Sequence, residues 1–112
     1  GGYITEATWY TVQSLYLDAG GQRVAAFGGC SFNSYYTSAY GFLRIVAPSG
    51  VVVASGYMAS AAVGDGTSHG SGFVSGDSLE VGTYKLQAQL NRYSVYVWSF
   101  TNRSLTLIGC KR

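Results

Sequence analysis

The chain has 112 residues, enough for one domain with a substantial core but too few for two. Only 11% of the residues are charged, against roughly 25% in ordinary soluble domains, and the net charge is +2. The scattered Lys and Arg residues argue against a nucleic-acid-binding protein, and no apolar run approaches the roughly 20 residues of a membrane-spanning helix.

Apolar residues recur at every second position and glycines interrupt the chain at short intervals, which predicts an all-β protein. We expect a first strand over residues 9–17 and a long second strand over 22–35. In the second strand the even-numbered residues 24–32 share one face. Its Gly28-Gly29 pair is typical of a bulge or of close packing.

The middle of the chain predicts a hairpin followed by a loop. Residues 40–47 and 51–59 read as strands, and Pro48-Ser49-Gly50 between them is a strong turn signal. Residues 61–72 contain few large side chains and are expected to be the least ordered part. A short fifth strand then ends at Phe73-Val74.

The last third predicts, after a turn at 75–78, three closely spaced strands, which bring the total to about eight. They are joined by turns at 91–92 and 101–103 and cover residues 82–90, 93–100 and 104–110. The middle strand has Val95 and Val97 on one side and Tyr96, Trp98 and Phe100 on the other. A strand that is apolar on both sides needs a cover on both sides. The second cover is expected to be either the opposite sheet or another copy of the chain.

A family resemblance narrows the choice among the sandwich, the barrel and the jelly roll. Its residues are Gly82-Thr-Tyr-Lys-Leu86, the alternating aromatic strand after them and the C-terminal run 104–110. This pattern resembles the tumour necrosis factor-like and complement-head-like jelly roll. In particular it resembles the trimeric heads that terminate bacteriophage tail fibres and the adhesive fibres of bacteria, including predatory bacteria.

The resemblance implies an antiparallel jelly-roll sandwich that assembles as a homotrimer. It also implies that both termini lie at the stalk end and that the final strand lies near the threefold axis. Residues 1–7 would then end a preceding stalk or linker, and residues 8–112 would form a single head domain. The implied location is extracellular, on a cell surface or a virion fibre.

No cluster of residues predicts a reaction. His69 is the only histidine and is interpreted either as a ligand-contacting residue or as an exposed loop residue. A stable metal site normally needs three or four protein ligands, so we expect no metal and no cofactor. The five carboxylates lie near the terminus, in expected turns or at a strand edge, and no nucleophile elbow joins a strand to a helix. We therefore expect a protein that is not an enzyme.

Cys30 and Cys110 admit two interpretations. They form a disulfide if their strands are neighbours, or they are two buried thiols that pack as small apolar groups. The sequence leaves both open.

The functional hypothesis is a non-catalytic receptor-binding tip domain that recognises a cell-surface glycan or envelope component, with no nucleic-acid partner and no membrane insertion. The alternatives are a structural trimerisation or capping module and a monomeric lectin-like β-sandwich. The ligand-binding candidates are Tyr35, Tyr36, Tyr40, Asp65 and His69. The trimer-interface candidates are Trp9, Tyr96, Trp98, Phe100, Leu105 and Leu107.

Overall fold

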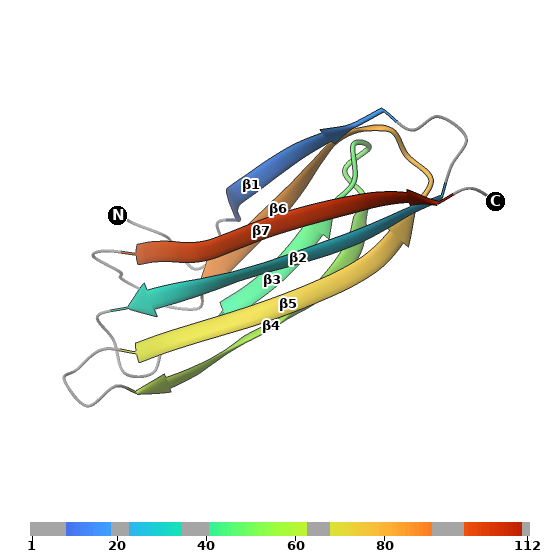
Figure 1. Cartoon of the computed structure of the whole chain (residues 1–112). Helices are drawn as coiled ribbons and strands as arrows, with labels where there is room; N and C mark the ends of the chain where they lie inside the picture. The colour runs from blue at the N-terminus through green and yellow to red at the C-terminus, as the bar shows by residue number, and fades with distance from the viewer. Residues whose placement is uncertain (1–8, 19–22, 35–40, 63–67, 91–97, 111–112) are drawn as a thin grey trace.

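The computed structural model describes residues 9–18, 23–34, 41–62, 68–90 and 98–110, and these residues form β-strands and their connections (Figure 1). All strand pairings among them are antiparallel, so the prediction of an antiparallel all-β protein is confirmed. The described part of the chain contains no helix long and apolar enough to cross a membrane. The seven described strands are β1 (Tyr10–Leu17), β2 (Arg23–Ser34), β3 (Gly41–Val46), β4 (Val52–Ala62), β5 (Ser68–Ser78), β6 (Gly82–Leu90) and β7 (Trp98–Cys110).

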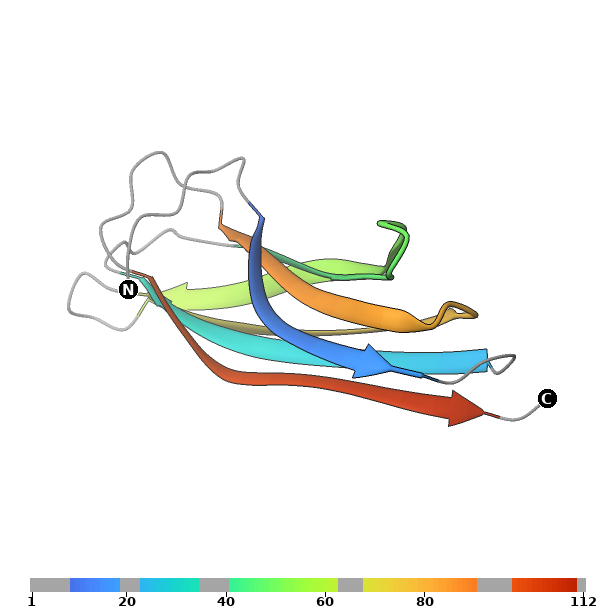
Figure 2. The same ribbon diagram turned by 90° about the horizontal axis from the view of Figure 1, so that it is seen from above.

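The strands pair in a nested pattern. β1 pairs with β6, β2 with β5 and β3 with β4, and the pairs β3–β6, β4–β5 and β2–β7 join them in the order β1-β6-β3-β4-β5-β2-β7. β4 takes part in both halves of this order, because its residues 52–58 pair with β3 and its residues 59–62 pair with β5. The sheet therefore folds into a sandwich of two layers (Figure 2). The first layer is β1, β6, β3 and residues 52–58 of β4, and the second is β5, β2, β7 and residues 59–62 of β4.

Alternate residues of the strands fill the space between the two layers. The inward face predicted for β2 is confirmed, since Val24, Ala26, Cys30 and Phe32 are buried together with Gly28. Buried apolar side chains from both layers form one core: Val12, Val24, Ala26, Cys30, Phe32, Leu43, Ile45, Ala47, Ala54, Met58, Val74, Tyr84, Leu86 and Ala88.

Tyr84 has the largest side chain of this core and is the only tyrosine among these core residues. The residue is fully buried, and its hydroxyl donates a hydrogen bond of 2.6 Å to the carbonyl oxygen of Glu80. A buried hydroxyl without a partner would destabilise the fold, and this bond removes that cost. The bond also holds the connection between β5 and β6 against the start of β6.

Glycines allow the two layers to approach closely. A methyl group on Gly28 of β2 would lie 2.7 Å from Cδ1 of Leu86 on β6, so the interpretation of close packing there is confirmed. On β5, a methyl group on Gly72 would lie 2.8 Å from the carbonyl oxygen of Tyr57, and one on Gly76 would overlap the carbonyl oxygen of Val53. The backbone of β4 thus lies directly against β5, with no room for a side chain between them.

The predicted hairpin between β3 and β4 is confirmed. The amide of Gly50 donates to the carbonyl oxygen of Ala47 at 2.9 Å, and Gly50 has a φ of 96°, a conformation that favours glycine. The carboxylate of Glu80 accepts hydrogen bonds from the amide and the hydroxyl of Ser49, at 2.7 and 2.8 Å. These bonds tie the hairpin turn to the connection between β5 and β6.

The predictions for residues 61–78 are wrong in part. The expected turn at 75–78 belongs to β5, which runs from Ser68 to Ser78, and β4 continues to Ala62. Only residues 63–67 of the expected loop lie outside the described residues. The small residues of β5 have a structural reason, because those facing inward leave the room that the β4 backbone occupies.

The expected turn at 101–103 is also wrong, because β7 runs without interruption from Trp98 to Cys110. Asn102 and Arg103 instead form a bulge opposite Cys30 of β2, where the register shifts. Asn102 has a φ of 51°, which asparagine tolerates better than most residues, so the same residue type suits a bulge as well as a turn. Of the expected two-faced strand, residues 93–97 lie outside the described residues, and Phe100 packs half-buried against the core.

The bulge in β7 places Arg103 near β1, the strand at the other end of the sheet order. Its Nη1 donates to the carbonyl oxygen of Val12, at 3.4 Å, at a second register shift in β1. The two end strands of the sheet, β1 and β7, are therefore in contact. β1 begins part-way along the sandwich and β7 ends at its right-hand end (Figure 2).

Cys30 is a free, buried thiol, so the disulfide interpretation is wrong. β2 and β7 are neighbours, as a disulfide would require, but Cys110 pairs with Arg23. Seven residues of extended strand, roughly 23 Å, separate that position from Cys30. The Cys30 thiol instead contacts the sulfur of Met58 at 3.7 Å.

We predict that Gly76→Ala lowers the free energy of unfolding by about 2–3 kcal/mol, because the new methyl group overlaps the Val53 carbonyl oxygen. The measurement is urea unfolding followed by circular dichroism. Ser75→Ala is the matched control, since Ser75 is the exposed neighbour on the same strand, and its effect should stay within ~0.5 kcal/mol. Equal stability of the two variants would contradict the close contact of β4 with β5.

We also predict that Cys30 reacts very slowly with thiol reagents in the native state. Burial raises the pKa of the Cys30 thiol to about 11, an effect that Arg103 partly offsets. At pH 8 the reactive thiolate is then roughly 100-fold less populated than in the unfolded chain. The experiment uses a Cys110→Ser variant and a chromogenic disulfide reagent, with and without guanidinium chloride. Similar rates in the two conditions would show that the thiol is accessible.

Candidate functional site

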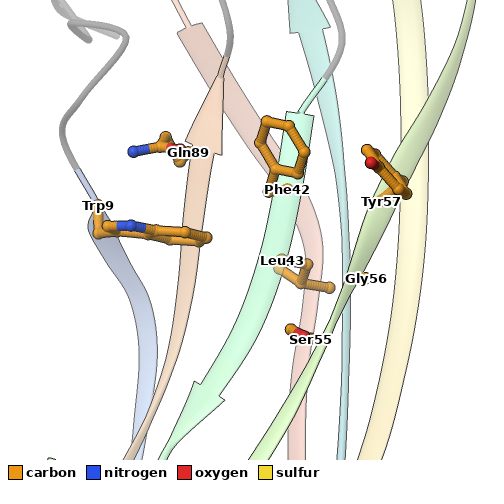
Figure 3. A pocket seen from close by; sticks show the side chains of 7 residues that line it. All are labelled: Trp9, Phe42, Leu43, Ser55, Gly56, Tyr57 and Gln89. Atoms are coloured by element: carbon orange, nitrogen blue, oxygen red, sulfur yellow. The ribbon is translucent and has the colours of Figure 1, made fainter. Parts of the chain in front are cut away.

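The outer face of the first layer carries a groove with three aromatic side chains in its lining, which we call the aromatic groove (Figure 3). Its volume is about 340 Å³, within the range of roughly 300–1,000 Å³ of small-molecule sites. The described residues that line it are Trp9, Phe42, Leu43, Ser55, Gly56, Tyr57 and Gln89.

Strand register brings three of these side chains into one row. Phe42 of β3 pairs with Gln89 of β6 on one side and with Tyr57 of β4 on the other. The rings of Phe42 and Tyr57 are tilted by 46° with their centroids 5.1 Å apart, and Tyr57 is 74% exposed. Trp9, just before β1, extends its half-buried indole across β6 toward Phe42, as Figure 3 shows. The rings therefore form a platform over four strands.

A second row of polar side chains runs beside the aromatic one. Arg44 of β3 pairs with Gln87 of β6, and its Nε donates to the side-chain oxygen of Gln87 at 2.8 Å. The amide nitrogen of Gln87 in turn donates to the hydroxyl of Thr11 on β1, at 3.2 Å. The guanidinium carbon of Arg44 lies 3.9 Å from the centroid of the Trp9 ring, a cation–π contact. The polar row thus holds Trp9 at the edge of the groove.

The chemistry of the lining suits binding. Among the described lining residues there is no carboxylate, imidazole or thiol, so none of them supplies a general base or an activated nucleophile of those kinds. No group of three or more His, Cys, Asp and Glu side chains that could hold a metal ion occurs in the described part of the chain. Two carboxylates elsewhere have partners, since Asp77 pairs with Arg23 at 2.9 Å and Glu80 binds Ser49.

Of the predicted ligand-binding residues, only His69 lies among the described residues. Tyr35, Tyr36, Tyr40 and Asp65 lie outside the described residues. His69 is exposed on β5 in the second layer, where its Nδ1 lies 2.5 Å from the side-chain oxygen of Asn33. It does not line the aromatic groove.

The predicted trimer-interface residues fall into three groups. Trp9 lines the aromatic groove, whereas Phe100, Leu105 and Leu107 pack half-buried against the core of their own chain. Trp98 lies in β7 with its side chain outside the description, and Tyr96 lies outside the described residues altogether. The assembly itself stays a prediction.

Phe42, Arg44 and Gln89 are not among the residues predicted for the site, although the sequence carries a signal for the two on β3. In β3 the residues Gly41, Leu43 and Ile45 are buried, so a period of two places Phe42 and Arg44 together on the outer face. An aromatic residue on the outer face of the strand, two positions from an arginine, was the available signal. Its partners on β1, β4 and β6 could be found only with the strand order.

No family model, curated protein or solved structure matches this chain. The resemblance to jelly-roll fibre heads therefore stays a prediction from the strand pattern.

Proposed function

We propose that this chain is a non-catalytic glycan-recognition domain and that the aromatic groove is its binding site. Aromatic rings contact the C–H-rich face of a sugar, while amide and hydroxyl groups bind its hydroxyls. The groove offers both, because its rings are flanked by Gln89 and Ser55. The observation that carries the proposal is the exposed Tyr57 ring, packed against Phe42 and facing the same groove as Trp9.

The site is built on strands, which favours binding. Phe42, Tyr57 and Gln89 all stand on paired strands, and Trp9 is held by its contact with Arg44. A ligand that meets side chains already in position loses less conformational freedom than one that must order a loop. Weak attraction to each sugar ring is then sufficient for recognition.

The setting that we propose is the tip of an adhesive or receptor-binding fibre, outside the cell or on a virion. The nested pairs β1–β6, β2–β5 and β3–β4 support a jelly roll, in which one long hairpin rolls up on itself, with β7 added beside β2. The low fraction of charged residues also fits a fibre domain. A capping module and a monomeric lectin-like sandwich are the alternatives, which ligand binding and particle size distinguish.

The homotrimer remains part of the proposal, with the outer face of the second layer as the contact between copies. Phe27 and Phe73 stack there with centroids 6.4 Å apart, and Phe73 is 66% exposed. The cross-strand partners of this pair are uncharged and small, since Ser75 and Thr106 lie opposite Phe27 and Gly29 lies opposite Phe73. Such a patch needs no charged partner, so it suits another copy of the same chain. Three linked grooves would raise the avidity for a repetitive glycan.

We predict that Tyr57→Ala weakens glycan binding at least tenfold, about 1.4 kcal/mol, because the exposed ring of the groove is removed. A glycan array identifies the ligand, and calorimetry with the free oligosaccharide measures its affinity without avidity. Phe73→Ala is the matched control, since it removes another exposed ring, on the opposite layer, and should leave this affinity unchanged. Binding of Tyr57→Ala with wild-type affinity, or no glycan binding at all, would refute the proposed site.

We predict that light scattering gives three copies per particle for the wild-type chain and that Phe73→Asp shifts the particle toward the monomer. The new charge would be buried without a partner in the proposed contact. Tyr57→Asp is the control, because it places the same charge on the other outer face and should keep the trimer. A monomeric wild-type chain would exclude the trimer and favour the lectin-like alternative.

A further inference from the structure

Arg44 is held in place beside the aromatic groove on two sides. Its guanidinium stacks on Trp9 at 3.9 Å, and its Nε is engaged by Gln87, which Thr11 orients in turn. Trp9 itself lines the groove, and the strand partner of Arg44 on β4 is Ser55, another lining residue. The cation is therefore positioned at the rim of the proposed sugar site.

The far end of the same guanidinium carries its remaining N–H donors. Within the described residues, no side chain or carbonyl accepts a hydrogen bond from Nη1 or Nη2 of Arg44. These two groups carry four of the five guanidinium N–H donors, in the planar fork that matches a carboxylate. Because Nε and the ring face are already engaged, the fork has a defined orientation.

The positive charge of Arg44 is not balanced by a carboxylate on the strands of its own layer. β1, β3, β4 and β6 carry Arg44 and Lys85 but no Asp or Glu. Partial burial lowers the pKa of the Arg44 guanidinium below its ordinary value, which reflects the cost of removing its charge from water. An anion bound to the fork would offset that cost, and arginine stays protonated at neutral pH.

We propose that the aromatic groove selects an acidic sugar, and that Arg44 binds its carboxylate while the sugar ring lies against the aromatic side chains. The proposal rests on the proposed glycan-binding function and adds the class of sugar. A uronic acid or a sialic acid has the required combination of an apolar ring face and a planar carboxylate. Neutral sugars would use the same rings but leave the Arg44 fork without an anion.

The test compares each carboxylated glycan with its own methyl ester, which keeps the ring and removes the charge. Trigalacturonate and sialyllactose, each with its ester, are titrated calorimetrically into the wild-type chain, Arg44→Gln and Lys85→Gln. Lys85 is the matched control, because it stands on the same outer face, on β6, opposite Val46 of β3. Circular dichroism verifies that each variant is folded.

For the wild-type chain we expect at least tenfold tighter binding of one acid than of its ester. Arg44→Gln should bring the acid within about twofold of the ester, whereas Lys85→Gln should keep most of the preference. Because Arg44 also holds Trp9, the readout is the ratio of the two affinities and not the affinity for the ester alone. Equal binding of acid and ester by the wild-type chain would overturn the acidic-sugar inference. An equal loss of preference in both variants would also overturn it. The preference for the acid would then come from the general positive charge of the outer face and not from the Arg44 guanidinium.

The failure of this inference differs from the failure of the proposed function. If neutral glycans or esters bind and Tyr57→Ala abolishes that binding, the aromatic groove is a glycan site without selectivity for acids. If no glycan of an array that contains both classes binds, the proposed function and the inference fail together.

Discussion

The contact between the β4 backbone and the glycines of β5 is the constraint on which the two-layer structure depends. β4 pairs with β3 and then with β5, so it must pass across the inner side of β5. Gly72 leaves room for the carbonyl of Tyr57, and Gly76 leaves room for that of Val53. Since Tyr57 alternates with the buried Met58, the same contact that closes the sandwich directs the Tyr57 ring outward into the aromatic groove.

The opposite side of the groove depends on how β1 is held. β1 is an end strand of the sheet and pairs only with β6 in the described structure. Arg103 of β7 binds its carbonyl at Val12, and Gln87 binds its hydroxyl at Thr11. Because Trp9 directly precedes this strand, these polar contacts determine where its ring meets the groove. The contact between the two end strands of the sheet, β1 and β7, therefore also helps to position Trp9 in the proposed site.

Predictions from sequence patterns were correct where the signal was local. They were wrong where the same residue type suits two different backbone structures. Pro48-Ser49-Gly50 closes a hairpin, and alternation identified the buried face of β2. Glycine and serine in β5 and Asn102 in β7 have the composition of turns, but in the structure they allow a close backbone contact and a bulge. Glycine and asparagine permit unusual backbone conformations and close approaches in turns and strands alike. Only the position of the neighbouring strand distinguishes a turn from a bulge or a close contact within a sheet.

By itself, the sequence determined the all-β class, the inward faces of its longer strands and the hairpin at Pro48, because alternation and turn chemistry act between residues close along the chain. The tertiary structure alone decided that Trp9, Phe42 and Tyr57 share one groove. It also decided that Cys30 and Cys110 lie far apart on neighbouring strands. Both outcomes depend on strand order and register, which are set by packing between residues distant in the sequence.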